Sequence, residues 1–488
     1  MPTRPVLAAT AAVVLGAASP LAAQHARLGT VDFPNSGAPA AQADFTRGVL
    51  LLHSFEFEDA ALAFRRAQDV DPDFALAYWG EAMSYNHPLW QQQDGEAARA
   101  ALARYAPTPE ARARKAPTER ERGYLEAVDV LYGSGSKARR DRAYMDAMAA
   151  LAARHPDDME ARAFHALAIL GSTDGVRDFA TYMKAAAVAQ PVFDANPDHP
   201  GAAHYLIHSF DDPVHAPLGL PAARAYSEIA PGAAHAQHMT SHIFVALGLW
   251  DDVVAANVRA RDVQDARLAE LGRPANACGH YTSWLHYGWL MRGDRRDADR
   301  GMDACLERAR AGGAPSEEAY YATMRARHVL DTRDWAQADR LDATVAAEGT
   351  ARLMVDFVTA YAALERGDRG TAAALLAAHQ EALARSGDAQ PRLRIQVLEL
   401  RALTALKDGR GDEAVALLGE ACALEEALPF EFGPPASLKP PHEMLGEALL
   451  ALDRHSDAAY AFEASLARTP GRVPSLEGLA RAKQDGPR

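Results

Sequence analysis

Residues 53–72, with the sequence HSFEFEDAALAFRRAQDVDP, decide the fold. Aromatic and small residues recur at helical spacing and a proline closes the run: Phe57, Ala60, Phe64, Ala67 and Pro72. Small residues let one helix pack closely on another, aromatic residues fill the space between helices, and proline cannot continue a helix. The stretch therefore predicts the second helix of a tightly packed helix pair.

The same pattern returns along the chain in units of 34 residues, the distance between Pro197 and Pro231. Further units show the same small, aromatic and closing positions: Ala185, Gly248, Trp250, Ala260, Gly293, Ala298, Cys305, Gly446, Ala458, Phe462 and Pro470. In spacing and residue type these units resemble the tetratricopeptide repeat (TPR). The resemblance covers most of residues 41–488. It implies an all-α fold, a right-handed superhelical solenoid of antiparallel helix pairs whose first helices line a concave groove.

The N-terminus has the features of a secretory signal peptide. Arg4 precedes a short apolar stretch, and small residues around Ala22 offer a cleavage site. The stretch is too short to span a membrane, although an uncleaved anchor is the alternative. We therefore predict an exported protein, periplasmic or secreted, with four segments: a signal peptide at 1–23, an extended lead-in at 24–40, an N-terminal array with a histidine-rich groove at 41–312, and a C-terminal array at 313–488.

Charge and hydropathy exclude some classes of partner. The formal net charge is −14, whereas a general nucleic-acid binder needs a basic surface that displaces counterions. The mature chain has no further long apolar run, so no transmembrane segment is predicted. An exported protein could oxidise a pair of its three cysteines. They are too scattered to indicate a disulfide framework, and we expect them to be small buried packing residues.

Two histidine pairs are the strongest candidates for chemistry. His204 and His208, like His238 and His242, are four residues apart, which places both rings of a pair on one face of a helix. Each member of the second pair follows its counterpart by 34 residues, so all four fall on the groove-lining helices of adjacent repeats. Such helices pack about 8–10 Å apart. The four imidazoles are therefore predicted to converge on one transition-metal ion, with zinc, copper or iron as candidates.

Other residues map to the same groove. His235 and His280 occupy the second position of their units, and Asp211 and Asp212 could be further ligands or accept imidazole N–H groups. Groove positions in other repeats hold His53, His87, Trp79, Glu443 and Glu447. For Trp79 groove packing is the simpler interpretation, and for the two glutamates it is a solvated or capping role.

The paired histidines also have alternative interpretations. Duplication of a repeat would copy a structural pair that bonds to backbone or carboxylates, and groove histidines could recognise an acidic peptide. The motifs around them, HYLIHSF and HMTSHIF, resemble those of a family of exported bacterial TPR proteins with recurrent H-x-x-x-H and H-M-x-S-H-I motifs. That family has no settled activity, so the resemblance implies a fold and marks the histidines without supplying a reaction.

Two functions follow from these observations. The first is an exported TPR protein that binds a transition metal in a histidine-lined concave site, where the metal could also support an enzymatic reaction. The alternative is a non-catalytic scaffold that binds a protein, peptide or small-molecule partner in the groove. Whether the protein is an enzyme is left open.

Overall fold

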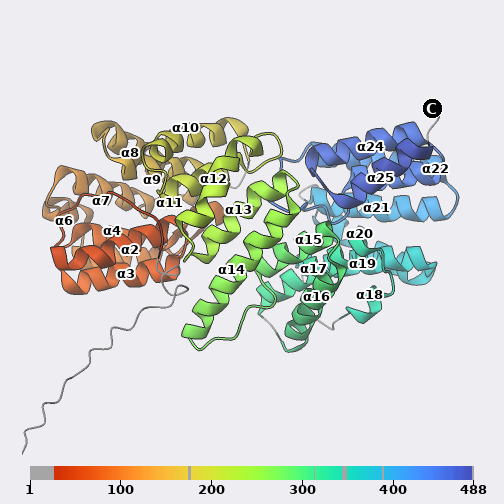
Figure 1. Cartoon of the computed structure of the whole chain (residues 1–488), viewed down its shortest axis with the longest axis horizontal. Helices are drawn as coiled ribbons and strands as arrows, with labels where there is room; N and C mark the ends of the chain where they lie inside the picture. The colour runs from red at the N-terminus through yellow and green to blue at the C-terminus, as the bar shows by residue number, and fades with distance from the viewer. Residues whose placement is uncertain (1–26, 174–176, 313, 343–348, 387–389, 486–488) are drawn as a thin grey trace, which may run out of the picture.

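The computed structural model describes residues 27–173, 177–312, 314–342, 349–386 and 390–485. Within these residues the chain consists of successive helices, most of which pack against the next helix in sequence. Figure 1 shows the helix pairs stacked side by side, from the red N-terminal part to the blue C-terminal part. This confirms the predicted all-α helical-repeat solenoid. The predicted signal peptide at 1–23 lies outside the described residues.

The N-terminal part, up to α10, contains short 3₁₀ segments, a two-stranded hairpin and nine α-helices among the described residues: η1 (Pro39–Ala41), α2 (Gln42–His53), α3 (Phe57–Val70), α4 (Ala75–Met83), β1 (Asn86–His87), η2 (Pro88–Trp90), β2 (Gln92–Gln93), α5 (Gly95–Tyr105), α6 (Pro109–Lys115), α7 (Glu119–Leu131), α8 (Lys137–Arg154), α9 (Met159–Gly171) and α10 (Phe179–Ala195). The histidine-rich segment and its neighbours follow as α11 (Pro200–Phe210), α12 (Ala216–Ile229), α13 (Ala234–Ala246), α14 (Trp250–Glu270), α15 (His280–Arg292) and α16 (Arg295–Arg310).

The remaining helices form the C-terminal half: α17 (Pro315–Thr332), α18 (Gln337–Arg340), α19 (Gly349–Arg366), α20 (Arg369–Ser386), α21 (Pro391–Lys407), α22 (Gly411–Glu426), α23 (Pro441–Ala451), α24 (His455–Arg468) and α25 (Val473–Asp485). Among the described residues, none of the helices is both long enough and apolar enough to cross a bilayer.

The aromatic and small residues of the repeat pattern pack against each other between the helices. Phe64 on α3 is fully buried, and its ring fills the space that glycine leaves at Gly48 on α2 and Gly80 on α4. At the other end of the chain, Phe462 on α24 fills the same kind of space against Gly446 and Gly478. A Cβ atom at any of these glycines would lie within 3 Å of the aromatic ring. Aromatic residues and small residues therefore set the spacing of the helices, as the sequence predicts.

Two irregular regions interrupt this regularity. The described part of the lead-in, 27–38, is extended and hydrogen-bonded to the repeats, with Thr30 N donating to Asp198 O at 2.9 Å. The polar segment after α4 forms the β1–β2 hairpin, with Asn86 opposite Gln93.

Buried apolar residues form a first large core from Leu28 to Trp284, a second from Cys278 to Ala448 and a small third cluster near the C-terminus. The boundary at 312–313 stays a prediction. Cys278 and Cys305 form a disulfide, which corrects the expectation that they are only packing residues, whereas Cys422 is a buried free thiol. The disulfide arises because α15 and α16 fold back on each other and bring together cysteines that are 27 residues apart.

Candidate metal centre

Helices α11, α13 and α15 carry the histidines of the candidate site. Helix α11 contacts α13, and α14 packs against both α13 and α15. His199 caps the start of α11, because its Nδ1 atom accepts a hydrogen bond from the backbone N–H of Ala202. Pro200 is the first residue of the helix, a position that suits proline because it has no backbone N–H that would need an acceptor. The 34-residue repeat places α13 beside α11 in the same register, so that the two H-x-x-x-H motifs lie next to each other.

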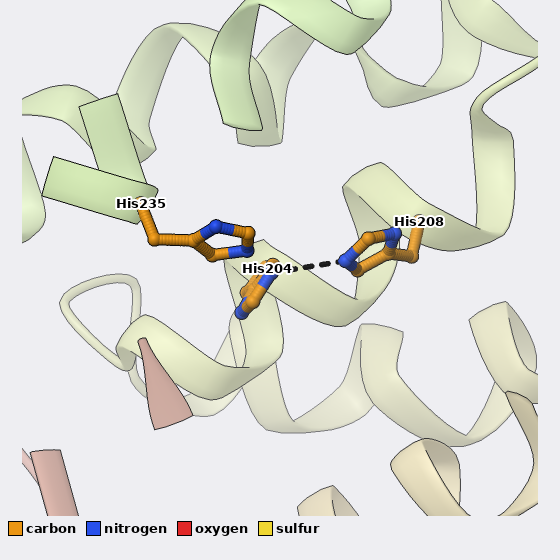
Figure 2. A group of neighbouring side chains, drawn as sticks. All are labelled: His204, His208 and His235. Carbon is orange, nitrogen blue, oxygen red and sulfur yellow. Dashed lines mark hydrogen bonds between the residues drawn. The ribbon is translucent and has the colours of Figure 1, made fainter. Parts of the chain in front are cut away.

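The first histidine set consists of His204, His208 and His235. The Nε2 atoms of His204 and His208 face each other at 3.0 Å, and His235 reaches them from the first turn of α13 (Figure 2). Its ring centroid lies 5.0 Å from that of His204. One nitrogen from each residue lies within 4.8 Å of the other two, a spacing that suits ligands of one ion.

The second set consists of His238, His242 and His280. The Nε2 atoms of His238 and His242 face each other at 3.1 Å, and His280 enters from the first residue of α15. The ring centroids of His238 and His280 are 4.5 Å apart, and the three ligand nitrogens again lie within 4.8 Å of one another. The same arrangement thus occurs twice, once for each H-x-x-x-H motif.

The structure does not gather the four predicted ligands into a single group. The first pair takes its third histidine from the start of α13 and the second pair from the start of α15. The sets approach each other at His208 and His242, whose ring centroids are 6.0 Å apart. His235 was predicted as an auxiliary residue. His280 was noted only for its repeat position, which is the same second position as that of His235. This shared position is the sequence signal from which His280 could have been predicted as a ligand.

Oxygen acceptors orient the rings. His204 Nδ1 donates to the backbone carbonyl of His53 at 2.7 Å, His242 Nδ1 donates to Asp211 Oδ2 at 2.6 Å, and His238 Nδ1 donates to Asn257 Oδ1 at 2.7 Å. The Asn257 amide is held in this orientation because its Nδ2 donates to the Val253 carbonyl. Ligand histidines in metal sites are commonly held in this way, with the second ring nitrogen donating to an oxygen.

These bonds determine where the lone pairs are in the second set. With Nδ1 of both His238 and His242 occupied as a donor, the neutral rings carry lone pairs on both Nε2 atoms. The two lone pairs then face each other across 3.1 Å. Only a proton or a cation between them would turn this contact into an attraction.

Burial disfavours a second proton on the imidazole rings. Desolvation lowers the pKa of His204 to about 3 and that of His280 to about 4, with neighbouring histidines adding to the effect. Desolvation likewise holds the pKa values of His208, His235 and His238 well below the ordinary value. Burial thus favours the neutral form of these five imidazoles, which is the form that binds metals.

A third cluster supports the first set. Glu160 on α9 accepts from His53 Nε2 at 2.7 Å and from His199 Nε2 at 3.1 Å, and Tyr205 donates to His53 Nδ1. Every one of these ring nitrogens has a hydrogen-bond partner, so we interpret the cluster as a structural network. It positions the backbone carbonyl of His53, which in turn orients His204.

The other predicted groove residues lie elsewhere. Asp212 pairs with Arg177 and caps the turn before α12, and His87 stacks on Phe57 with ring centroids 4.0 Å apart. Trp79 is fully buried in an aromatic core. Glu443 and Glu447 belong to an ion-pair network in the C-terminal half. None of these residues contributes to either histidine set.

Aromatic rings close the site. Phe55, whose backbone has a φ of +56°, packs its ring 4.3 Å from that of His204. Trp284 lies 4.4 Å from His242 and 4.7 Å from His238, measured between ring centroids. The segment 427–440 crosses Trp284 at Gly433, so the connection between α22 and α23 covers the second set.

Gly433→Ala is expected to lower the free energy of unfolding by about 2–4 kcal/mol, because two costs add. Gly433 has a φ of +80°, and a Cβ atom there would lie 2.1 Å from the Trp284 ring. Gly409→Ala is the matched control: its φ is +76° but no atom lies within 4 Å of the added Cβ, so it should cost only about 1–2 kcal/mol. Urea unfolding of both variants measures the difference, and equal losses would show that Trp284 is not confined by this segment.

Comparisons with known proteins complete the description. No protein-family profile matches the chain, and no curated protein matches its sequence. Among solved structures, the Cut9–Hcn1 hetero-tetramer of the APC/C is 12% identical over 93% of this chain and 78% of its own, with a TM-score of 0.36. Yeast Tom70 is 12% identical over 91% and 95%, with a TM-score of 0.34. The TPR domain of P58(IPK) is 14% identical over 91% and 98%, with a TM-score of 0.22. Overlaps this loose transfer no function to this chain, whose own helix pairs identify it as an all-α helical-repeat solenoid.

Proposed function

We propose that this protein binds two first-row transition-metal ions in adjacent three-histidine sites. His204, His208 and His235 hold the first ion, and His238, His242 and His280 hold the second. Neutral imidazole donors suit copper, zinc and iron, and both sets lack a carboxylate ligand, which favours copper or zinc. Three protein ligands leave a coordination position for water or a substrate, as in catalytic zinc sites, so metal-dependent chemistry belongs to this proposal.

One observation carries the proposal: the facing Nε2 lone pairs of His238 and His242. Both Nδ1 atoms are committed as donors to Asn257 and Asp211, and burial keeps His238 neutral. A metal ion between the two nitrogens replaces a repulsion with two bonds of about 2.0–2.1 Å. His235 Nε2 is buried and has no hydrogen-bond partner among the residues that the structure describes, so it is available as a metal ligand at the first set.

Export belongs to the same proposal. The features of residues 1–23 predict a signal peptide. An exported protein would acquire its ions outside the cytoplasm, in the periplasm or after secretion.

The test is elemental analysis of the full-length mature protein, purified without chelators and reconstituted separately with zinc, copper or iron. We expect two ions per chain for the wild type. Because each substitution removes a ligand from only one set, His208→Gln and His242→Gln should each retain one ion, and the double variant none. His165→Ala, on α9 outside both sets, is the control that should retain two.

Circular dichroism on the same samples checks that the variants are folded. A wild type that takes up no ion from any of the three metals, or variants that retain both ions, would overturn the proposal. The histidines would then be groove residues, and the alternative function, a scaffold that binds a partner, would take precedence. For that function the C-terminal half offers a separate groove, lined among others by Trp335, Tyr361 and Met444.

A further inference from the structure

A cavity lies behind the second histidine set, where the two halves of the chain meet. Its walls combine residues of the histidine-rich half with residues that follow α22, in particular Asp211, Val245, Trp250, Tyr287, Phe430 and Arg468. Most of this lining is apolar or aromatic. In Figure 1 the blue C-terminal helices α24 and α25 lie beside the green helices at this junction.

Asp211, which lines this cavity, has a carboxylate oxygen without a hydrogen-bond partner among the described residues. Asp211 is 1% exposed, and its Oδ2 accepts from His242 Nδ1 at 2.6 Å. Its Oδ1 is buried and has no hydrogen-bond partner among the described residues. A buried carboxylate oxygen left without a donor is costly, so the fold leaves an acceptor for a ligand's N–H or O–H group.

A guanidinium of opposite charge lines the same cavity. Arg468 lies over the Phe430 ring at 4.7 Å and donates one long hydrogen bond, 3.4 Å, to the Leu428 carbonyl. Within the described part of the chain no carboxylate forms an ion pair with it. Its remaining N–H groups are the kind that bind a carboxylate with two parallel hydrogen bonds.

The other charged groups in the wall already have partners. Arg472 is bound by Glu443 and Asp331, and Glu431 accepts from Arg392 at 3.0 Å. Burial raises the pKa of Glu425, whereas its hydrogen bond with Ser437 and the positive charge of Arg468 oppose this shift. Asp211 Oδ1 and the Arg468 guanidinium are therefore the charged groups of the wall that keep hydrogen-bonding capacity for a ligand.

We propose that this cavity binds a small zwitterion, an α-amino acid with a short side chain. The ammonium group donates to Asp211 Oδ1 and the carboxylate accepts from the Arg468 guanidinium. The apolar and aromatic wall, with Val245, Trp250 and Tyr287, takes the side chain. This inference goes beyond metal binding and does not require a bound ion, although Asp211 also orients His242 and so places the amino acid next to the second histidine set.

Calorimetric titration of the full chain with glycine and with L-alanine tests the proposal, on metal-free and metal-loaded samples alike. Methylammonium and acetate, which each carry one end of the zwitterion, are the comparison probes. We expect at least one amino acid to bind and each half-probe to bind at least tenfold more weakly, since each lacks one charged hydrogen-bonding group.

Two variants separate the site from its surroundings. Arg468→Gln should weaken amino-acid binding at least tenfold while the metal content stays unchanged, and Ala246→Phe should abolish binding by filling the cavity. Arg481→Gln, which lines the separate C-terminal groove, is the control that should bind like the wild type. No binding of either amino acid, equally tight binding of acetate alone, or unchanged binding in Arg468→Gln would overturn the proposal. Because metal content is measured separately, failure of the metal proposal would not be mistaken for failure of this one.

Discussion

Glu443→Ala is expected to lower the free energy of unfolding by about 3–5 kcal/mol, because it removes the carboxylate that the buried Arg472 and Lys439 share. Each cation is then left with one carboxylate partner, Asp331 for Arg472 and Glu447 for Lys439. The Glu443 carboxylate is fully buried and accepts from Arg472 Nε at 2.7 Å, Lys439 Nζ at 2.8 Å and Ser475 Oγ at 2.6 Å. Burial alone would raise the pKa of Glu443, but Arg472 and Lys439 hold it well below the usual range. The carboxylate is thus ionised, and its partners depend on it.

Glu447→Ala is the matched control for this prediction. Glu447 lies one turn further along α23 and bonds to Lys439 at 2.8 Å and Arg333 at 2.6 Å, but its side chain is 21% exposed. Partly solvated ion pairs contribute about 0–1 kcal/mol, so this variant should lose much less stability. Urea unfolding of both variants at neutral pH measures the difference. Similar losses would mean that the Glu443 network does not hold α23 and α25 together.

Glu160→Gln is expected to cost roughly 3 kcal/mol of stability above pH 5. Burial would raise the pKa of Glu160, but the charges and hydrogen bonds of His199 and His53 outweigh it and lower the pKa from 4.5 to about 2. Each unit of such a shift corresponds to about 1.36 kcal/mol. A depressed carboxyl pKa stabilises the fold above the unfolded pKa, and this stability is lost as the pH falls through the folded pKa.

The pH dependence of this stability loss tests whether the ionised Glu160 carboxylate causes it. The stability difference between the wild type and Glu160→Gln should be fully present near pH 5 and shrink as the pH falls from 4.5 toward 2. Urea unfolding across this range measures it, and Arg162→Gln, on the same helix, should show no such trend. A difference that is independent of pH would contradict the ionised network. Since Glu160 acts on His204 only through the His53 carbonyl, the variant should also weaken metal binding at the first set more than at the second.

Local spacing predicted the fold and two of the three residues in each histidine set. The 34-residue repeat of small, aromatic and proline positions was sufficient for an all-α solenoid, because each repeat packs mainly against its neighbours and the same contacts recur, as at Phe64 and Phe462. The i, i+4 spacing of His204 and His208 likewise places the two rings on one face of a helix, independently of the tertiary structure. The four-ligand prediction assumed that the two pairs meet across the groove.

Contacts between helices that are distant in sequence decided the third residue of each histidine set and the partners of the buried glutamates. His235 and His280 complete the two sets from the first turns of α13 and α15, and Glu160 reaches His53 from a helix 107 residues away in sequence. Glu443, predicted for the groove, instead pairs with Arg472 in the buried ion-pair network. Helix geometry determines the relative positions of residues only within a turn or two. The curvature of a solenoid comes from side-chain packing between its helices, and that packing decides which residues of separate repeats meet.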